Sequence, residues 1–213
     1  MRTGGKKERM REEIRAEKQR QRQLARERRA RISPEALAEG SRRIEEQVLA
    51  LPAYQEAQTV MAYMSMPGEP ETRGIILDAI RRGKRVLLPR CLDGKRMEAA
   101  LFTGFEDLVP GRMGIPEPGK QEGAAFGQET APERQGGTEK REPKAEQPDL
   151  ILIPCMAATP DGKRLGHGAG YYDRFLPGSA GLKVCLCFQA LLAEDLPTDE
   201  NDIRMDLVVT DSG

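Results

Sequence analysis

Short runs of apolar residues alternate along the chain with segments whose apolar positions recur every three or four residues. The apolar runs at 59–64, 85–89, 97–102, 149–154, 183–188 and 207–209 predict β-strands. Helical spacing lies between some of them, first at 72–80. The order strand, helix, strand is typical of a βαβ unit with a parallel, buried sheet. We therefore expect one α/β domain over residues 1–213.

Turn and capping residues set the predicted ends of the helices. Ser33 and Pro34 supply an N-cap and a first helical position for a second helix, which Pro52 ends. Thr72 is expected to cap the helix after the first strand. Residues 119–148 are rich in Gly, Pro and charge and have no apolar period, so a loop or flexible insert is expected there.

The N-terminal segment is strongly basic. Residues 1–31 hold 13 Lys and Arg against 5 acidic residues, which a net acidic remainder offsets to a formal charge of zero. Such an arm can bind nucleic acid. Here the acidic residues are interleaved with the basic ones, and no aromatic residue is present for a base to stack on. We therefore favour a solvated, ion-paired helix with Ile14 and Leu24 as its few apolar contacts, and no nucleic-acid partner.

The cysteine and hydropathy patterns exclude other classes. The four cysteines show no C-x-x-C spacing and His167 is the only histidine, so a zinc site lacks ligands. Cys185 and Cys187 lie in an apolar run and are expected as small core residues of a strand. The basic start has no apolar h-region behind it, and no run approaches eighteen apolar residues. We expect a cytoplasmic protein without a membrane partner.

The segment with the most chemistry is RLGHGAGYYDR at 164–174. Its three glycines can adopt positive φ and let backbone N–H groups approach an anion closely. Arg164 can fork onto phosphate oxygens, and Asp173 can hold a cation that neutralises them. A helix beginning near Gly170 would point its free N–H groups at the same anion. The composition indicates a nucleotide site.

The glycines alone leave an alternative open. Their G-x-G-x-G spacing matches neither the dinucleotide fingerprint nor the phosphate loop, and a Gly-rich surface turn that binds nothing has the same pattern. The flanking cation, aromatic residues and carboxylate favour the binding site. The segment also follows the strand at 149–154, and open α/β sheets bind ligands beyond the carboxyl ends of their strands.

Several motifs, taken together, resemble one known family. They are DLILIP at 149–154, GKRLGHGAGYYDRFL at 162–176, MSMPGEPET at 64–72, LPR at 88–90, GIPEP at 114–118 and NDIRMD at 201–206. In their order along the chain, these motifs closely resemble the signature of the 5-formyltetrahydrofolate cyclo-ligases, also called 5,10-methenyltetrahydrofolate synthetases. The resemblance implies a three-layer α/β sandwich with a mostly parallel open, Rossmann-like sheet. It also implies ATP-dependent closure of 5-formyltetrahydrofolate to 5,10-methenyltetrahydrofolate, with ADP and phosphate released.

The resemblance also implies a role for particular residues. It places ATP at Lys18, Arg22, Arg164, Leu165, Gly166, His167, Gly168, Ala169, Gly170, Tyr171 and Tyr172. It places the folate at Met64, Glu69, His167 and Tyr171. It makes Arg164 and Tyr171 catalytic. It assigns Mg²⁺ to Asp173 and Asp202. Small molecules are the expected partners, and a monomer is the expected state.

Two registers compete for the family's basic motif on the first helix. KQRQR at 18–22 keeps the lysine, and its ends lie on one helix face as a shared phosphate requires. REEIR at 11–15 keeps the apolar fourth position but loses the lysine. We prefer Lys18 and Arg22. The alternative to both is that these side chains are simply solvated.

The chain departs from the family near the predicted site. His167 stands where relatives usually have an aromatic residue or Arg, and Ala169 where they have Gly or Lys. CMAAT at 155–159 replaces a family segment that carries an aromatic residue and a carboxylate, and this could loosen the folate pocket. A diverged folate- or nucleotide-binding protein with little turnover is therefore the alternative function.

Overall fold

A seven-stranded sheet forms the centre of the protein. The structure is a computed structural model that describes residues 4–119, 125–126 and 147–212. The strand order is β11-β10-β7-β1-β2-β3-β6. Its strands are β1 Thr59–Met61, β2 Arg85–Cys91, β3 Met97–Leu101, β6 Ala125–Phe126, β7 Leu150–Pro154, β10 Leu182–Leu186 and β11 Leu207–Val209. The first five strands in this order pair in parallel, whereas β3 pairs antiparallel with both β2 and β6.

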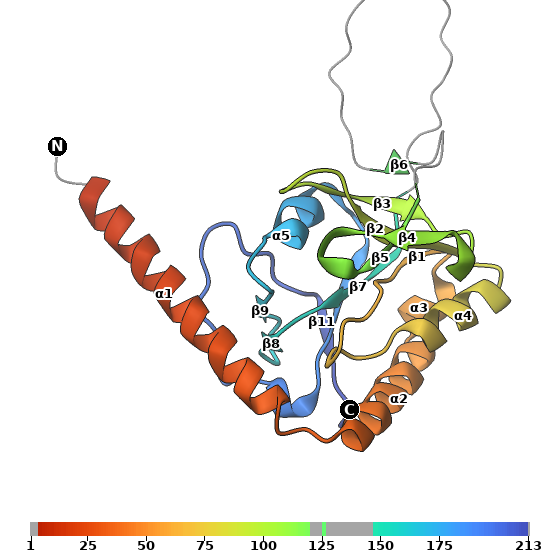
Figure 1. Ribbon diagram of the computed structural model, residues 1–213, viewed down its shortest axis with the longest axis horizontal. Helices are drawn as coiled ribbons and strands as arrows, with labels where there is room; N and C mark the ends of the chain where they lie inside the picture. Colours follow the sequence, from red (N-terminus) through yellow and green to blue (C-terminus); the bar gives the residue numbers. More distant parts are fainter. Residues whose placement is uncertain (1–3, 120–124, 127–146, 213) are drawn as a thin grey trace, which may run out of the picture.

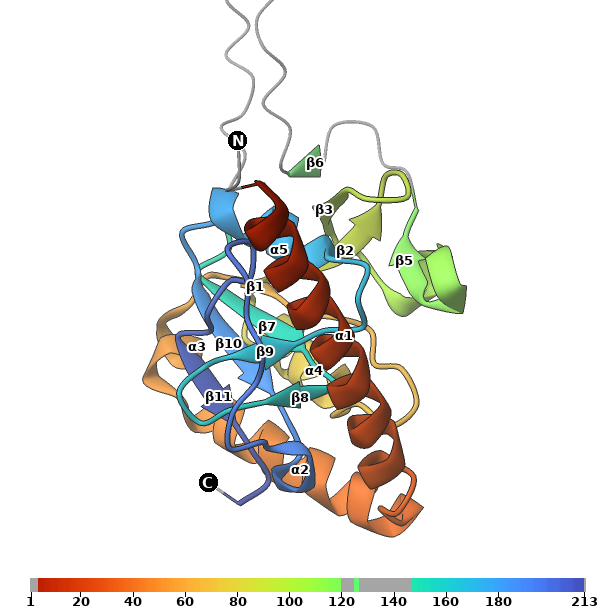
Figure 2. The same cartoon turned by 90° about the vertical axis from the view of Figure 1, so that its left-hand side faces the viewer.

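Helices cover both faces of this sheet, so the predicted three-layer α/β sandwich is confirmed (Figures 1 and 2). The helices are α1 Gly4–Arg29, α2 Pro34–Ala50, α3 Pro52–Glu56, α4 Arg73–Arg81 and α5 Tyr171–Phe175. Helices α2, α3 and α4 lie on one side, and α1 and α5 on the other. The central strand β7 is apolar throughout because both of its faces are buried, and Leu150 to Ile153 are fully inaccessible.

Smaller elements surround the sheet. Two hairpins pair β4 Leu108–Pro110 with β5 Pro116–Pro118, and β8 Ala157–Ala158 with β9 Arg164–Leu165. Short 3₁₀ turns lie at Phe105–Asp107, Arg112–Gly114, Leu176–Gly178 and Gln189–Leu191. The sequence predicted neither hairpin, because strands of two or three residues have no recognisable period.

The predicted helix ends are largely confirmed. Ser33 Oγ accepts a hydrogen bond from the N–H of Ala36 at 3.2 Å, and α2 ends before Pro52, which begins the short helix α3. The prediction for Thr72 is wrong in its detail. Its hydroxyl donates to the carbonyl oxygen of Tyr63 instead of capping α4, and Glu71 accepts the N–H groups at the helix start.

Most of the predicted insert, 119–148, lies outside the described residues. Its described part includes β6, which pairs with β3. All four cysteines are free, and Cys185 and Cys187 are buried as expected. Among the described residues, no helix is long and apolar enough to cross a membrane.

Gly162, in the turn between β8 and β9, and Gly83 provide a matched test of the packing of that turn against Met205. Both have positive φ, 91° and 73°, but a Cβ on Gly162 would lie 2.4 Å from the carbonyl oxygen of Met205, whereas a Cβ on Gly83 meets nothing within 4 Å. We expect Gly83→Ala to cost about 1 kcal/mol from backbone strain alone and Gly162→Ala at least about 2 kcal/mol. Denaturant unfolding measures both. Equal losses would contradict the role given to the contact with Met205.

Candidate functional site

One large cavity, about 1310 Å³ in volume, lies beyond the carboxyl ends of the central strands. Every residue that the sequence predicted for ATP, folate or metal lines it. Strands β1 and β7 are parallel neighbours, so the loops that follow them leave the sheet at the same edge. The chain runs outward from these strands in opposite directions, to β2 on one side and to β10 on the other. The cavity therefore lies at the topological switch point of the sheet.

The glycine loop, residues 166–170, joins β9 to α5. Gly168 and Gly170 have positive φ, 104° and 68°, which glycine adopts without strain. The prediction of positive φ was wrong for Gly166. That glycine is instead needed for space, since a Cβ there would lie 2.9 Å from a terminal nitrogen of Arg164. Helix α5 begins at the loop as expected but has only five residues, so its dipole is weak.

Arg164 is buried beneath the glycine loop. Its side chain is 4% exposed, and its two terminal nitrogens donate to the carbonyl oxygen of Pro154 at 3.1 Å and to Asp173 Oδ1 at 2.9 Å. Among the described residues, its Nε and the hydroxyl of Tyr172 are buried polar atoms without a hydrogen-bond partner. Burial raises the pKa of Tyr172, so that hydroxyl keeps its proton at neutral pH.

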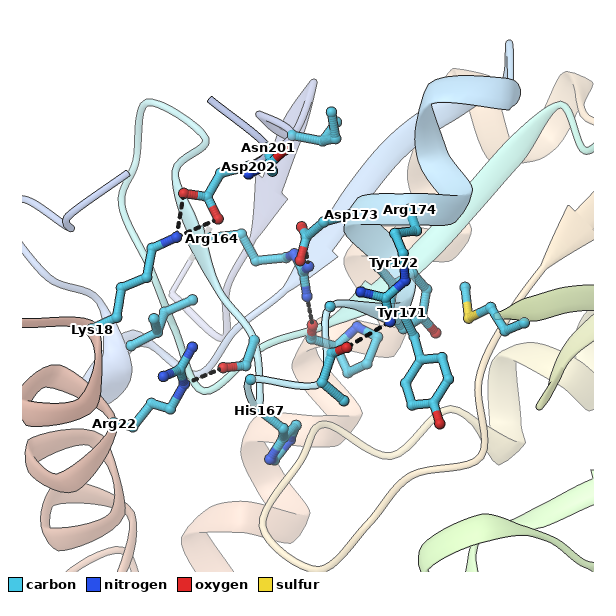
Figure 3. A pocket seen from close by; sticks show the side chains of 18 of the residues that line it. Lys18, Arg22, Arg164, His167, Tyr171, Tyr172, Asp173, Arg174, Asn201 and Asp202 are labelled. Carbon is cyan, nitrogen blue, oxygen red and sulfur yellow. Dashed lines mark hydrogen bonds and ion pairs between the residues drawn. The ribbon is translucent and has the colours of Figure 1, made fainter. Parts of the chain in front are cut away.

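Helix α1 brings cations to the other side of the loop (Figure 3). Lys18 Nζ lies 2.6 Å from Asp199 Oδ2 and 2.6 Å from Asp202 Oδ2. Burial alone would lower the pKa of Lys18, but these two hydrogen bonds raise it above its ordinary value. Arg22, one turn further along, donates from Nε to the carbonyl oxygen of Gly166 at 2.9 Å.

These contacts favour the preferred register of the basic motif. Lys18 and Arg22 both reach the site, as their spacing predicts. Arg11 of the other register pairs instead with Glu200, and the side chains of that pair are more than half exposed. Arg15 lines the cavity without a contact that decides its role.

The loop after β1 presents Glu69 to the same cavity. This side chain is 2% exposed, and both carboxylate oxygens have partners. Oε2 accepts the N–H of Met66 at 2.9 Å, and Oε1 lies 2.9 Å from Nε2 of His167. His167 points away from Lys18 and Asp202 (Figure 3). The structure thus joins a residue of the predicted folate loop to one of the glycine loop, 98 positions apart.

The start of α5 is tied to the turn between β2 and β3. Tyr171 donates its hydroxyl to the carbonyl oxygen of Asp93 at 3.3 Å. Arg174 donates from Nε to the carbonyl oxygen of Lys95 at 2.6 Å and from a terminal nitrogen to that of Ala169 at 2.7 Å. Burial raises the pKa of Tyr171, which makes it a hydrogen-bond donor at neutral pH.

The acidic residues fit magnesium chemistry only as part of a larger complex. Within the described chain, no three or more His, Cys, Asp or Glu side chains form a metal-binding group. Asp173 and Asp202 line one cavity, and each already pairs with a cation. Mg²⁺ commonly takes one or two carboxylates and completes its shell with water and phosphate oxygens. Two carboxylates that line one cavity fit that requirement.

Sequence reasoning missed part of the lining. The missed residues include Cys91, Arg112, Glu117 and Asp199. One signal in the sequence could have identified the part of the lining that α1 contributes. The α1 residues at the cavity, among them Ile14 and Lys18, recur every three or four positions and so share one face of the helix. Residues 155–159 are buried and, in the described structure, none lines the cavity, so the expected effect of this segment on the folate pocket stays a prediction.

The fold and the cavity define an α/β protein with a cavity at its switch point, lined by a glycine loop and several cationic side chains. Comparison with known proteins makes this assignment more specific. The model of the 5-formyltetrahydrofolate cyclo-ligase family matches residues 11–211. The chain belongs to this family, and it is an enzyme, a ligase of folate metabolism.

Relatives from distant organisms agree. The 5-formyltetrahydrofolate cyclo-ligase of Escherichia coli K12 is 30% identical over 199 residues, which cover 89% of this chain and 97% of that protein. The enzyme of the same name from Saccharomyces cerevisiae is 31% identical, covering 83% and 87%. The solved structure of Aquifex aeolicus 5,10-methenyltetrahydrofolate synthetase has a TM-score of 0.74 and 26% identity, covering 92% of this chain and 90% of that one.

The Lys18 cluster predicts a pH-dependent contribution to stability. Burial alone would raise the pKa of Asp199, but hydrogen bonds from Lys18 and Asn201 lower it. A carboxyl with a lowered folded-state pKa stabilises the fold above its unfolded pKa of about 3.9, and that stability is lost as the pH falls through the folded value. We expect Lys18→Met to lower the free energy of unfolding by about 1–3 kcal/mol at pH 7, and by progressively less as the pH falls below about 3.9 and through the lower folded value.

Lys7→Met is the matched control for this substitution. Lys7 pairs with Glu200 at 3.5 Å, and its side chain is 58% exposed, so its loss costs about 0–1 kcal/mol at most. Chemical denaturation at pH 7 and at about pH 2 measures both variants. A loss for Lys18→Met that is the same at the two pH values would contradict the role of its carboxylate partners.

Proposed function

We propose that this enzyme catalyses the ATP-dependent closure of 5-formyltetrahydrofolate to 5,10-methenyltetrahydrofolate, with release of ADP and phosphate. Family membership supports the reaction. The observation that carries it is the cavity, which brings a glycine loop flanked by Arg22 and Arg164 together with a buried carboxylate on a second loop. One half suits a nucleotide and the other suits the hydrogen-bonding edge of a pterin. Since all these residues come from one chain, a monomer suffices.

The chemistry explains the division of the site. The formyl oxygen is a poor leaving group, so the γ-phosphoryl group is transferred to it and the bond to ADP breaks. The N10 lone pair then attacks the formyl carbon, the carbon–oxygen bond breaks, and phosphate departs while N10 loses its proton. The protein's task is to position two substrates and to neutralise charge.

The nucleotide half is rich in cations. Lys18 and Arg22 reach the glycine loop from α1, and Arg164 lies beneath it. We assign the ATP phosphates to this region, where the buried Nε of Arg164 and the loop N–H groups serve as donors. The uncharged Ala169 leaves the loop without a lysine, so these three cations carry the neutralisation.

Asp173 and Asp202 are the residues that would hold Mg²⁺. A bound Mg²⁺ would neutralise charge on the β- and γ-phosphate oxygens. The carboxylates orient the complex against the loop, while Arg164 and Lys18 keep them in place.

The folate half is formed by the loop after β1. Glu69 is suited to accept paired N–H groups of the pterin, and Met64 lines the same wall. Tyr171 lines the same cavity, and its protonated hydroxyl donates near the formyl group once it leaves the carbonyl oxygen of Asp93. Four free thiols suit a reducing compartment such as the cytoplasm.

Formation of the methenyl chromophore by purified protein tests the function. We expect turnover that requires ATP, Mg²⁺ and 5-formyltetrahydrofolate together. Asp173→Asn is expected to lower kcat by at least about 100-fold, because it removes a charge that orients the phosphate complex. Asp195→Asn is the control, since Asp195 is 75% exposed and lies outside the cavity.

A folded wild-type protein without turnover would contradict the proposal. If the two ligands raised its Tm although no product formed, the alternative, a diverged folate- or nucleotide-binding protein, would be favoured. Equal activity in both aspartate variants would refute the role of Asp173 alone.

A further inference from the structure

We propose that His167 couples the two substrate sites by holding Glu69 until a ligand displaces it. Each ligand would then favour the binding of the other. The inference rests on the proposed function, because it takes ATP and a reduced folate as the two ligands. It concerns a position at which this chain carries its only histidine.

The contact between the two residues occupies the atoms that a pterin would need. Nε2 of His167 lies 2.9 Å from Glu69 Oε1, and the N–H of Met66 donates a hydrogen bond to Oε2 at 2.9 Å. The Glu69 side chain is 2% exposed, so water cannot readily replace a lost partner. Each carboxylate oxygen can accept a second hydrogen bond, but this side chain is almost fully covered, so a pterin reaches Oε1 only when the imidazole moves aside.

The imidazole can be displaced because of where it lies. His167 is between Gly166 and Gly168, and its side chain is 31% exposed. Gly168 has φ of 104°, in a region where glycine moves at little cost. The loop stays anchored on both sides of His167, since Arg22 donates to the carbonyl oxygen of Gly166 and Arg174 to that of Ala169. The ring can therefore move without dissociation of the loop from α1.

The same N–H group has an alternative acceptor when a nucleotide is bound. His167 belongs to the loop to which the phosphates are assigned, so a phosphate oxygen there can accept the hydrogen bond that Glu69 gives up. Both ligands then bind best to the state in which His167 has left Glu69. Ligands that favour one common state bind with positive linkage, which must be reciprocal. His167 is thus a positioning residue that acts through Glu69.

Calorimetric titration of the intact chain measures this linkage. The ligands are 5-formyltetrahydrofolate and a non-hydrolysable ATP analogue with Mg²⁺, each titrated alone and in the presence of the other. In the wild type we expect each ligand to lower the Kd of the other about tenfold. In His167→Ala, the folate alone should bind about tenfold more tightly, because no imidazole competes for Glu69, and the linkage should fall to near one.

His167→Gln is the matched variant. Its side-chain amide can donate to the same oxygen of Glu69, so it should keep the weaker folate binding of the wild type and part of the linkage. This pattern separates the proposal from a structural role, in which both substitutions would weaken folate binding. Unchanged or weaker folate binding in His167→Ala, or full linkage without the imidazole, would overturn the proposal.

The wild type separates this proposal from the proposed function. Independent binding of both ligands with normal turnover would refute the coupling and leave the cyclo-ligase activity standing. Failure to bind either ligand would refute both.

Discussion

The parallel pairing of β1 with β7 is the constraint on which the site depends. These two strands are distant in sequence, yet their register places Val60 beside Leu150 at the centre of the sheet. Both strands therefore end at the same edge, and the loop with Glu69 faces the loop with His167. Burial of the continuous apolar strand β7 fixes this arrangement, because a shift of β7 by one residue would reverse which side chains face each helical layer.

Ion pairs join the elements that form the wall of the cavity. The cavity wall is assembled from α1, the hairpin β8–β9 with α5, and the segment around Asp202, which contact one another through ion pairs. Apolar packing supports the same junction, since Ala25 of α1 and Leu165 of β9 belong to one buried cluster. The paired charges hold the carboxylates and cations near the place where phosphate is expected. Helix α1 is therefore part of the site and not a solvated arm.

The sequence predicts the framework well because the framework follows local patterns. The strand at 149–154 is recognisable as a continuous apolar run, and Ser33 with Pro34 marks the start of α2. Residues of the site could be predicted only because their motifs match a family. The antiparallel pairing of β3 could not be predicted, since strand direction depends on partners elsewhere in the chain.

The contacts among the predicted residues were also beyond sequence reasoning. Lys18 was expected on phosphate and Asp202 on metal, yet they bind each other. His167 was recognised in the sequence only as a departure from the family pattern, and its hydrogen-bond partner, Glu69, is seen only in the folded structure. Such pairs form only when the fold brings distant segments together, and the spacing of residues within one motif does not predict which segments will meet.

Transfer of an isotopic label tests the central claim most directly. 5-Formyltetrahydrofolate carrying ¹⁸O in its formyl group is converted by the wild-type enzyme with ATP and Mg²⁺, and the released phosphate is analysed by mass spectrometry. If the formyl oxygen is activated by phosphoryl transfer, one ¹⁸O atom enters each phosphate as the methenyl product forms. Methenyl product accompanied by unlabelled phosphate would contradict the account.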